Sequence, residues 1–238
     1  MSTTLEPALD LLDLTPLPEE HRPVRGGRAK WPLFGVVAGV TGYVSAVAAL
    51  SNGVTEEDAR AGVDVVAQLE RTPYHVAFLT GLVSVAALFV VAAGWRRWAD
   101  RNAPDDLAAR TIGTAIGATA AINVIFTCLA GSMALYLPGG TDHGWLSQDG
   151  IFVNYTLLDF GSLLGWWGTF VGAACVATLA LRRRRVLPRW MGIVSVVLMV
   201  PPLALGAVTA LPGFVGLTMP IWIVVTSLGL VFSRTAKA

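Results

Sequence analysis

Charge is what this sequence has least of. Only 14% of its 238 residues are charged, against about a quarter in ordinary soluble domains. The formal net charge of +1 excludes a strongly basic nucleic-acid binder. Two cysteines are too few for a disulfide scaffold. Cys128 and Cys175 both fall inside apolar runs, and we interpret both as small buried hydrophobic side chains.

Motifs that dictate a chemistry are also missing. The sequence has no Walker loop, dinucleotide fingerprint, zinc-protease helix or nucleophile elbow. Its lysines, Lys30 and Lys237, lie outside the apolar runs, so none is placed to bind a retinal-type ligand. We therefore predict no catalytic residue, no metal site and no cofactor, and the interpretation leans against an enzyme.

Long apolar runs are what the chain does have. Apolar residues make up 54% of it, and its mean hydropathy is +0.62. A helix needs about 20 apolar residues to cross a bilayer, and six runs reach that length: 31–50, 76–95, 111–137, 151–181, 191–211 and 214–232. They predict an all-α, polytopic bundle of six transmembrane helices over 31–233. Residues 1–30 are polar and proline-bearing, and we expect a disordered cytoplasmic tail there.

The basic residues predict the orientation of these helices. Four precede the first run, four lie between the second and third, five between the fourth and fifth, and two follow the sixth. The opposite connections contain only Arg60 and Arg71. Because basic loops stay in the cytoplasm, we expect both termini inside, in the plasma membrane. The fourth connection is further expected to bind anionic lipids of the inner leaflet through Arg182, Arg183, Arg184, Arg185 and Arg189.

The first outer connection has a pattern of its own. Thr55 with Asp58 three residues later resembles a helix-capping pair. Charged and apolar residues then alternate from Glu56 to Glu70, ahead of Pro73. This pattern predicts a short amphipathic helix lying on the outer face of the membrane.

Asp159 is the ionisable residue inside the fourth run, where a charge is costly and therefore a candidate for function. It belongs to a stripe spaced by three and four residues, which places side chains on one helix face. The stripe consists of Tyr155, Asp159, Ser162, Trp166 and Thr169. In one interpretation it lines an outward-opening cavity, where Asp159 binds a cation, a proton or a polar headgroup. In the other it is a helix–helix seam, and the carboxyl is hydrogen-bonded to a neighbour.

Three more residues complete the candidate ligand-binding set. Asn123 lies near the middle of the third run, where its amide needs either an interhelical partner or a substrate. His75 and His143 map to the outer end together with several acids. These residues have no metal-ligand spacing. We therefore favour solvated loop residues over a metal site or an acid–base pair.

Glycines and prolines are expected to shape the packing. Glycines recur at 161, 165, 168 and 172, and as pairs at 35/39 and 113/117. They allow close helix approach, either within the bundle or across a dimer seam. Pro201–Pro202 and Pro220 remove helical hydrogen bonds and predict kinks in the last two spans. The freed backbone groups either bind a substrate, as in transporters, or are satisfied by neighbouring helices.

The last third of the chain resembles a group of bacterial six-helix membrane proteins known as a domain of unknown function. The resemblance follows an arginine-rich loop, the segment VLPRWMG at 186–192, the Pro-Gly pair at 212–213 and a tryptophan in the last span. It covers 75–233 in layout and 182–232 in motif. It implies a six-helix fold and no particular activity.

Together these features lead to a choice of function classes. The first is binding or transport of a small molecule, ion or lipid through an outward-facing pocket around the fourth span. The second is a non-catalytic accessory subunit that packs against a protein partner, or against a second copy, through glycine faces or its tail. The third is a membrane enzyme acting on a lipid or isoprenoid.

Overall fold

The structure, a computed structural model, describes residues 30–52, 54–55, 58, 60, 62–183, 186–210 and 212–232. The expected cytoplasmic tail, apart from Lys30, lies outside these ranges, as do Arg184 and Arg185.

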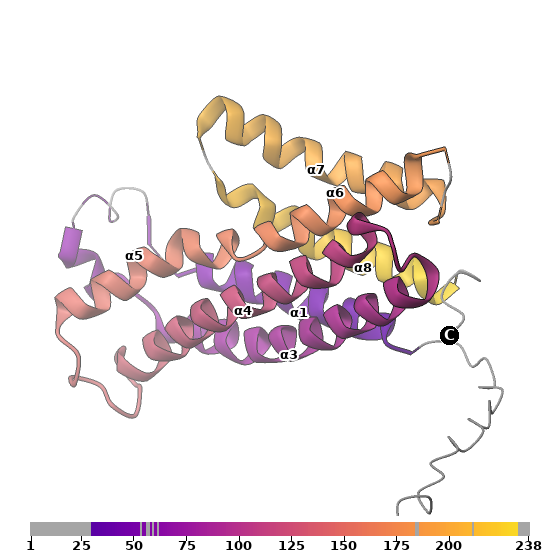
Figure 1. Cartoon of the computed structure of the whole chain (residues 1–238). Helices are drawn as coiled ribbons and strands as arrows, with labels where there is room; N and C mark the ends of the chain where they lie inside the picture. The colour runs from indigo at the N-terminus through magenta and orange to yellow at the C-terminus, as the bar shows by residue number, and fades with distance from the viewer. Residues whose placement is uncertain are drawn as a thin grey trace, which may run out of the picture.

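The described chain is helical, and no β-strand occurs within it. Its elements are α1 (Pro32–Leu50), the 3-10 helix η1 (Gly62–Gln68), α3 (Arg71–Asn102), α4 (Leu107–Tyr136), α5 (Gln148–Leu164), α6 (Trp167–Leu181), α7 (Arg189–Thr209), the 3-10 helix η2 (Pro212–Phe214) and α8 (Val215–Phe232) (Figure 1). Six stretches are long and apolar enough to cross a membrane: α1, α3, α4, α5 together with α6, α7, and α8. The prediction of an all-helical chain with six candidate spans is confirmed.

The candidate spans pack as a ring of neighbours. Helix α1 packs against α3 and α8, α3 against α4, α4 against α6, and α6 against α7, which returns to α8. Helix α5 precedes α6 in the same span and packs against α4, α1 and η1 (Figure 1). Segments far apart in the sequence, such as α1 and α8, are therefore direct neighbours.

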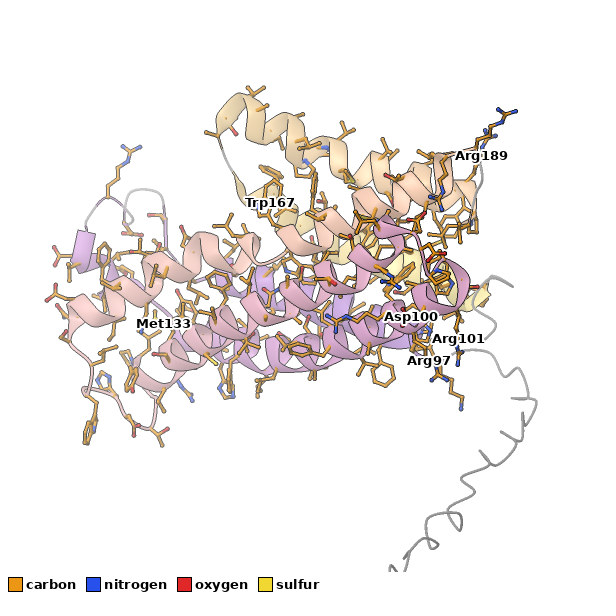
Figure 2. The ribbon with its side chains drawn as sticks, viewed as in Figure 1. Arg97, Asp100, Arg101, Met133, Trp167 and Arg189 are labelled. Atoms are coloured by element: carbon orange, nitrogen blue, oxygen red, sulfur yellow. The ribbon has the colours of Figure 1, made fainter. Side chains whose placement is uncertain are left out.

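The bundle has two chemically different ends. The end that carries Arg97, Arg101 and Arg189 is here called the basic end (Figure 2). The opposite end, called the η1 end, contains η1 and the connection between α4 and α5 (Figure 1). Where an amphipathic helix was expected after Thr55, the described residues form η1, and Thr55 and Asp58 hydrogen-bond to each other.

The helix expected over 151–181 is interrupted. Helix α5 ends at Leu164, and α6 begins at Trp167. The backbone N–H of Trp166 bonds to the carbonyl of Leu163 at 3.5 Å, one residue closer than in an α-helix. Gly165 sits at the interruption, and glycine is a poor helix former.

The prolines do not end the helices in which they lie. Helix α7 contains both Pro201 and Pro202, and α8 contains Pro220. Among the described candidate spans, the fourth is thus interrupted, whereas α7 and α8, where kinks were expected, run through their prolines.

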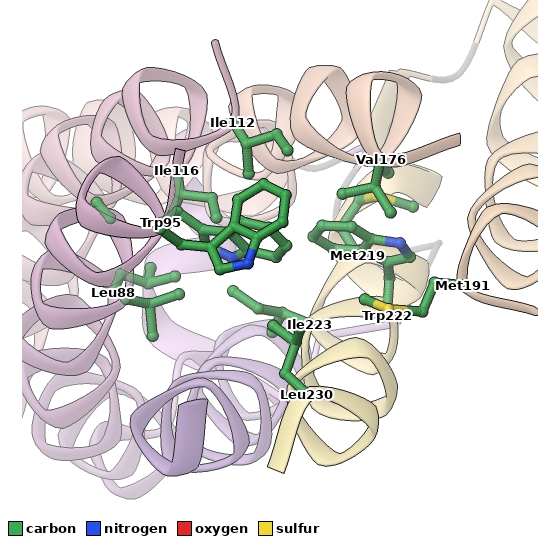
Figure 3. Packing of buried hydrophobic residues seen from close by; sticks show 14 of the residues in the cluster. Leu88, Trp95, Ile112, Ile116, Val176, Met191, Met219, Trp222, Ile223 and Leu230 are labelled. Atoms are coloured by element: carbon green, nitrogen blue, oxygen red, sulfur yellow. The ribbon is translucent and has the colours of Figure 1, made fainter. Parts of the chain in front are cut away.

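Large apolar side chains fill two clusters. One lies among α3, α4, α6, α7 and α8 around the fully buried Trp95 and Trp222 (Figure 3). The buried indole N–H of Trp222 has a hydrogen-bond partner, because it donates to the Ser195 hydroxyl at 2.8 Å. The other cluster surrounds Tyr74 and Met133 at the η1 end. Between apolar helices in lipid, such close packing and hydrogen bonding are what hold the spans together.

The glycine faces are used inside the chain. The glycines on α5 and α6 face α4: Gly161 lies against Phe126, Gly165 against Asn123, and Gly168 against Thr119. The other pairs behave alike, with Gly35 against Ser227 of α8 and Gly113 against Arg96 of α3. Their close approach is intramolecular.

The expectation of two buried cysteines is wrong for one of them. Cys128 is exposed on α4, and Cys175 is partly buried. A membrane helix is apolar all round, so an apolar neighbourhood in the sequence does not tell which face a side chain occupies.

Candidate functional site

A small cavity lies among α1, α3, α4 and α5, beside the interruption between α5 and α6. Its volume is about 20 Å³, enough for roughly one water molecule. The walls are small or polar side chains, with few large ones: Gly42, Ser45, Ala46, Ala49, Ala77, Gly81, Ser84, Val85, Asn123, Phe126, Thr127, Ala130, Leu158, Ser162 and Trp166.

The α1–α3 wall is held by a reciprocal pair of serines. Ser45 of α1 donates to the carbonyl of Ala77 in α3 at 2.8 Å, and Ser84 of α3 donates to the carbonyl of Ala38 in α1 at 2.8 Å. Each hydroxyl therefore uses its one donor in a hydrogen bond to the backbone of the opposite helix. Both oxygens keep lone pairs, so this wall can still accept hydrogen bonds from a guest.

The α4–α5 wall is different, because its polar groups are unpartnered. The amide nitrogen of Asn123 and the hydroxyl of Ser162 are both buried, and neither has a hydrogen-bond partner within the described chain. Each of these residues is only 9% exposed. A buried polar group without a partner costs about 1–3 kcal/mol. These two groups are therefore available to a guest in the cavity that they line.

Gly165 lets the end of α5 lie close to Asn123. A Cβ atom on Gly165 would lie 2.8 Å from Cγ of Asn123, which is closer than a side chain tolerates. The helix interruption and the Asn123 amide are thus in direct contact. Trp166, only 2% exposed, closes the cavity next to the interruption and lies against Gly42 of α1.

A second polar group, here called the outer cluster, lies toward the η1 end and consists of Asn52, Tyr74, Tyr155 and Asp159. Tyr155 lies one helical turn before Asp159 on α5 and packs in the same apolar cluster as Tyr74. Asn52 and Asp159 are both near enough to these phenols to affect them electrostatically. Tyr74 is only 1% exposed, and its hydroxyl has no hydrogen bond of good geometry. Asp159 is half-buried and makes neither a hydrogen bond nor an ion pair with any residue that the structure describes.

The predicted site residues are thus divided. Asn123, Ser162 and Trp166 line the cavity, and Tyr155 and Asp159 belong to the outer cluster on the same helix. Thr169, the last residue of the predicted stripe, donates to the Thr119 hydroxyl at 3.0 Å. The stripe is therefore a cavity wall at one end and a helix seam at the other.

The two predicted histidines lie elsewhere. His75 is exposed on α3. His143 is exposed in the loop between α4 and α5, and its Nδ1 is 3.3 Å from the carbonyl of Tyr136. Neither lines the cavity. Over the described ranges, no three His, Cys, Asp or Glu side chains come close enough together to hold a metal ion.

The sequence interpretation missed half of the cavity. Small residues recur every three or four positions on α1 (Gly42, Ala46 and Ala49) and on α3 (Ala77, Gly81 and Ser84). This spacing puts them on one face of each helix. Two facing stripes of small residues, carrying serines, are a signal that could have found this wall.

The basic end holds an ion pair outside the cavity. Asp106 caps the start of α4 by accepting from the N–H of Ala109 at 3.1 Å, and it pairs with Arg182 at the end of α6. The hydrogen bond from Arg182 is the main reason why the pKa of Asp106 lies below its usual value. Arg182, one of the arginines expected to bind lipid, is therefore already engaged by a carboxylate.

Comparisons were made with family models, with curated proteins and with solved structures, and none of them matches this chain. The resemblance of 182–232 to a six-helix bacterial family stays a prediction.

Proposed function

We propose that this chain is a multi-pass protein of the plasma membrane that binds or transports a small ion or polar molecule through the cavity beside the α5–α6 interruption. The carrying observation is the pair of buried, unpartnered groups, Asn123 and Ser162, on one wall of that cavity. Discontinuous helices at ligand sites are a recurrent device of membrane transporters. Of the ligand classes expected from the sequence, a lipid chain fits least, because the cavity is water-sized.

The proposed orientation follows from the charges. We place the basic end in the cytoplasm, with both termini, and the η1 end outside, with η1 lying at the outer membrane surface. The outer cluster then faces the external medium and is the first group that an entering ligand meets. The exposed Arg183 and Arg189 are proposed to contact anionic lipids of the inner leaflet.

The experiment is a thermal-unfolding screen of the full chain in lipid nanodiscs. The probes are chloride salts of lithium, sodium, potassium and ammonium, sodium salts of acetate, nitrate and phosphate, and acetamide as a neutral solute. At least one probe should raise the unfolding midpoint, since a ligand that binds only the folded state stabilises it. The Ser162→Ala variant should lose this shift.

The matched control is Thr156→Ala. Thr156 lies on the same helix, but it is exposed, and its hydroxyl bonds to the carbonyl of Phe152 in its own helix at 2.9 Å. It should keep the wild-type response. Equal responses in Ser162→Ala and wild type, or no response to any probe, would contradict the proposal.

A second candidate, the accessory subunit, is favoured by the surface of α7. This helix is the least buried of the candidate spans, and Ile193, Val197 and Val200 are each more than half exposed. Lipid covers such a surface as well as a partner does. Native mass spectrometry distinguishes the two, since a stable partner would travel with the chain as a second polypeptide.

A further inference from the structure

Asp159 has an acidic side chain with no counter-charge among the residues that the structure describes. It is half-buried in a helix apolar enough to span a membrane, and no basic side chain pairs with it within the described residues. At the same end of the bundle, Arg71 hydrogen-bonds to the backbone instead of to Asp159. Its Nε donates to the carbonyl of Ala134, in the last turn of α4, at 2.7 Å. A charge in this position is expensive unless something neutralises it.

The groups around Asp159 are oxygens. Tyr155 precedes Asp159 by one turn on the same helix and packs against the cluster that contains Tyr74, so both phenols lie on the side of α5 that carries Asp159. The amide of Asn52 is near enough to both phenols to affect them electrostatically. The Asn52 amide oxygen accepts one hydrogen bond, from the N–H of Val54 at 3.1 Å, and keeps a second lone pair. Tyr74 supplies the independent sign of a ligand, since its hydroxyl is buried and makes no hydrogen bond of good geometry with any described residue, Asn52 included.

We propose that the outer cluster is a binding site for a monovalent metal cation, Na⁺ or K⁺, held by Asp159 together with oxygens of Tyr74, Tyr155 and Asn52. This inference rests on the proposed function and names the class of ligand that enters the bundle. Carboxylate, carbonyl and hydroxyl oxygens suit hard cations, whereas transition metals prefer nitrogen or sulfur ligands. One carboxylate balances one positive charge, which favours a monovalent over a divalent ion.

The outer cluster continues into the cavity on three elements. Ala49 of the cavity wall precedes Asn52 by three residues, Ala77 follows Tyr74 by three, and Leu158 follows Tyr155 by three. On α3 and α5, where these residues are helical, one turn is about 5.4 Å, so the cluster and the cavity are about one turn apart; Asn52 lies just beyond the end of α1 at Leu50. A cation leaving Asp159 would meet Ser162 next on the same helix face.

The test is cation titration of the full chain in nanodiscs of neutral phosphatidylcholine, at fixed pH. Ionic strength is held constant with N-methyl-D-glucamine chloride, whose cation is far larger than Na⁺ or K⁺. The readouts are the unfolding midpoint against Na⁺ or K⁺ concentration and the line width of the ²³Na nuclear resonance. Wild-type protein should show saturable stabilisation.

Variants assign the site. Asp159→Asn, which keeps shape and removes charge, should raise the half-saturating concentration at least tenfold. Asp159→Glu should retain part of the affinity, and Tyr74→Phe should weaken binding several-fold. Asp149→Asn is the matched control, because it removes an exposed carboxylate from the first turn of the same helix; its titration should match wild type.

The two proposals fail in different ways. If stabilisation comes from an anion or a neutral solute and depends on Ser162, the cation site is overturned while the proposed function stands. Equal cation titrations in wild type and Asp159→Asn overturn the cation site as well. If no probe stabilises the wild-type chain, both proposals are wrong. Should Asp159→Asn fail to fold, Tyr74→Phe and Asp159→Glu carry the same test.

Discussion

Asp106 and Arg182, 76 positions apart in the sequence, form an ion pair that joins the start of α4 to the end of α6. The Arg182 side chain is 34% exposed and that of Asp106 is 19% exposed, so the pair is only partly open to water. The same carboxylate caps α4. One residue therefore orients a helix start and ties it to a neighbouring span.

Replacing Asp106 should separate these two roles. Asp106→Ala removes both the cap and the ion pair, and should cost about 1–2 kcal/mol of unfolding free energy. Asp106→Asn keeps a good capping side chain and loses only the charge, so it should cost less. Chemical denaturation in detergent micelles measures both. Equal losses in the two variants would mean that the cap contributes nothing.

The ion pair also predicts a pH dependence. The pKa of Asp106 in the folded chain lies below its usual value, mainly because of the hydrogen bond from Arg182. Its stabilisation is therefore complete above about pH 4, where the carboxyl is ionised even in the unfolded chain, and is lost as the pH falls through the folded-state pKa. Unfolding midpoints between pH 6 and pH 3 should fall more steeply for wild type than for Asp106→Asn.

The contact of Gly165 with Asn123 predicts a strong effect of one methyl group. Gly165→Ala would place Cβ 2.8 Å from Cγ of Asn123, and overpacking of this kind costs about 1–3 kcal/mol. Gly172→Ala is the matched control on the adjoining helix α6, because its Cβ would lie 3.8 Å from the nearest atom, on Ile116. It should be neutral or slightly stabilising, since alanine favours helix. Similar unfolding midpoints for the two variants would contradict the close approach.

The bond from Trp222 to Ser195 predicts a loss specific to the α7–α8 contact. Ser195→Ala leaves the buried indole N–H of Trp222 without its 2.8 Å acceptor, and should cost about 1–3 kcal/mol. Thr178→Ser is a mild control on an exposed position of α6, where the hydroxyl bonds within its own helix. Denaturation followed by tryptophan fluorescence measures the difference. An unchanged midpoint in Ser195→Ala would show that this bond adds no stability.

The proposed orientation predicts which side of the membrane each loop faces. In a background with Cys128 and Cys175 replaced by alanine, His143→Cys should react with a membrane-impermeant maleimide on intact cells. Arg101→Cys, at the basic end, should react only after the membrane is opened. The reverse pattern would place the basic end outside.

Sequence patterns determined the six candidate spans and the candidate residues on the fourth span. Apolar length alone distinguishes a spanning helix, because a lipid bilayer requires about 20 apolar residues whatever their order. The spacing of Tyr155, Asp159, Ser162 and Trp166 was sufficient to put them on one face, since helical geometry is local. Asn123 was singled out because an amide in an apolar run needs a partner.

Only the tertiary structure decided which of these residues share a cavity and where the helix breaks. Asn123 and Ser162 line the same cavity, and Gly165 lets the end of α5 lie directly against Asn123 of α4, a long-range contact that the sequence does not show. Tyr74 and Asn52 carried no signal in the sequence, because their meaning comes from lying beside Asp159. The sequence by itself determined how many candidate spans there are and that polar residues recur along one face of the fourth, since both follow from local composition and spacing. The cavity and the outer cluster arise from helices that are neighbours in space and not along the chain.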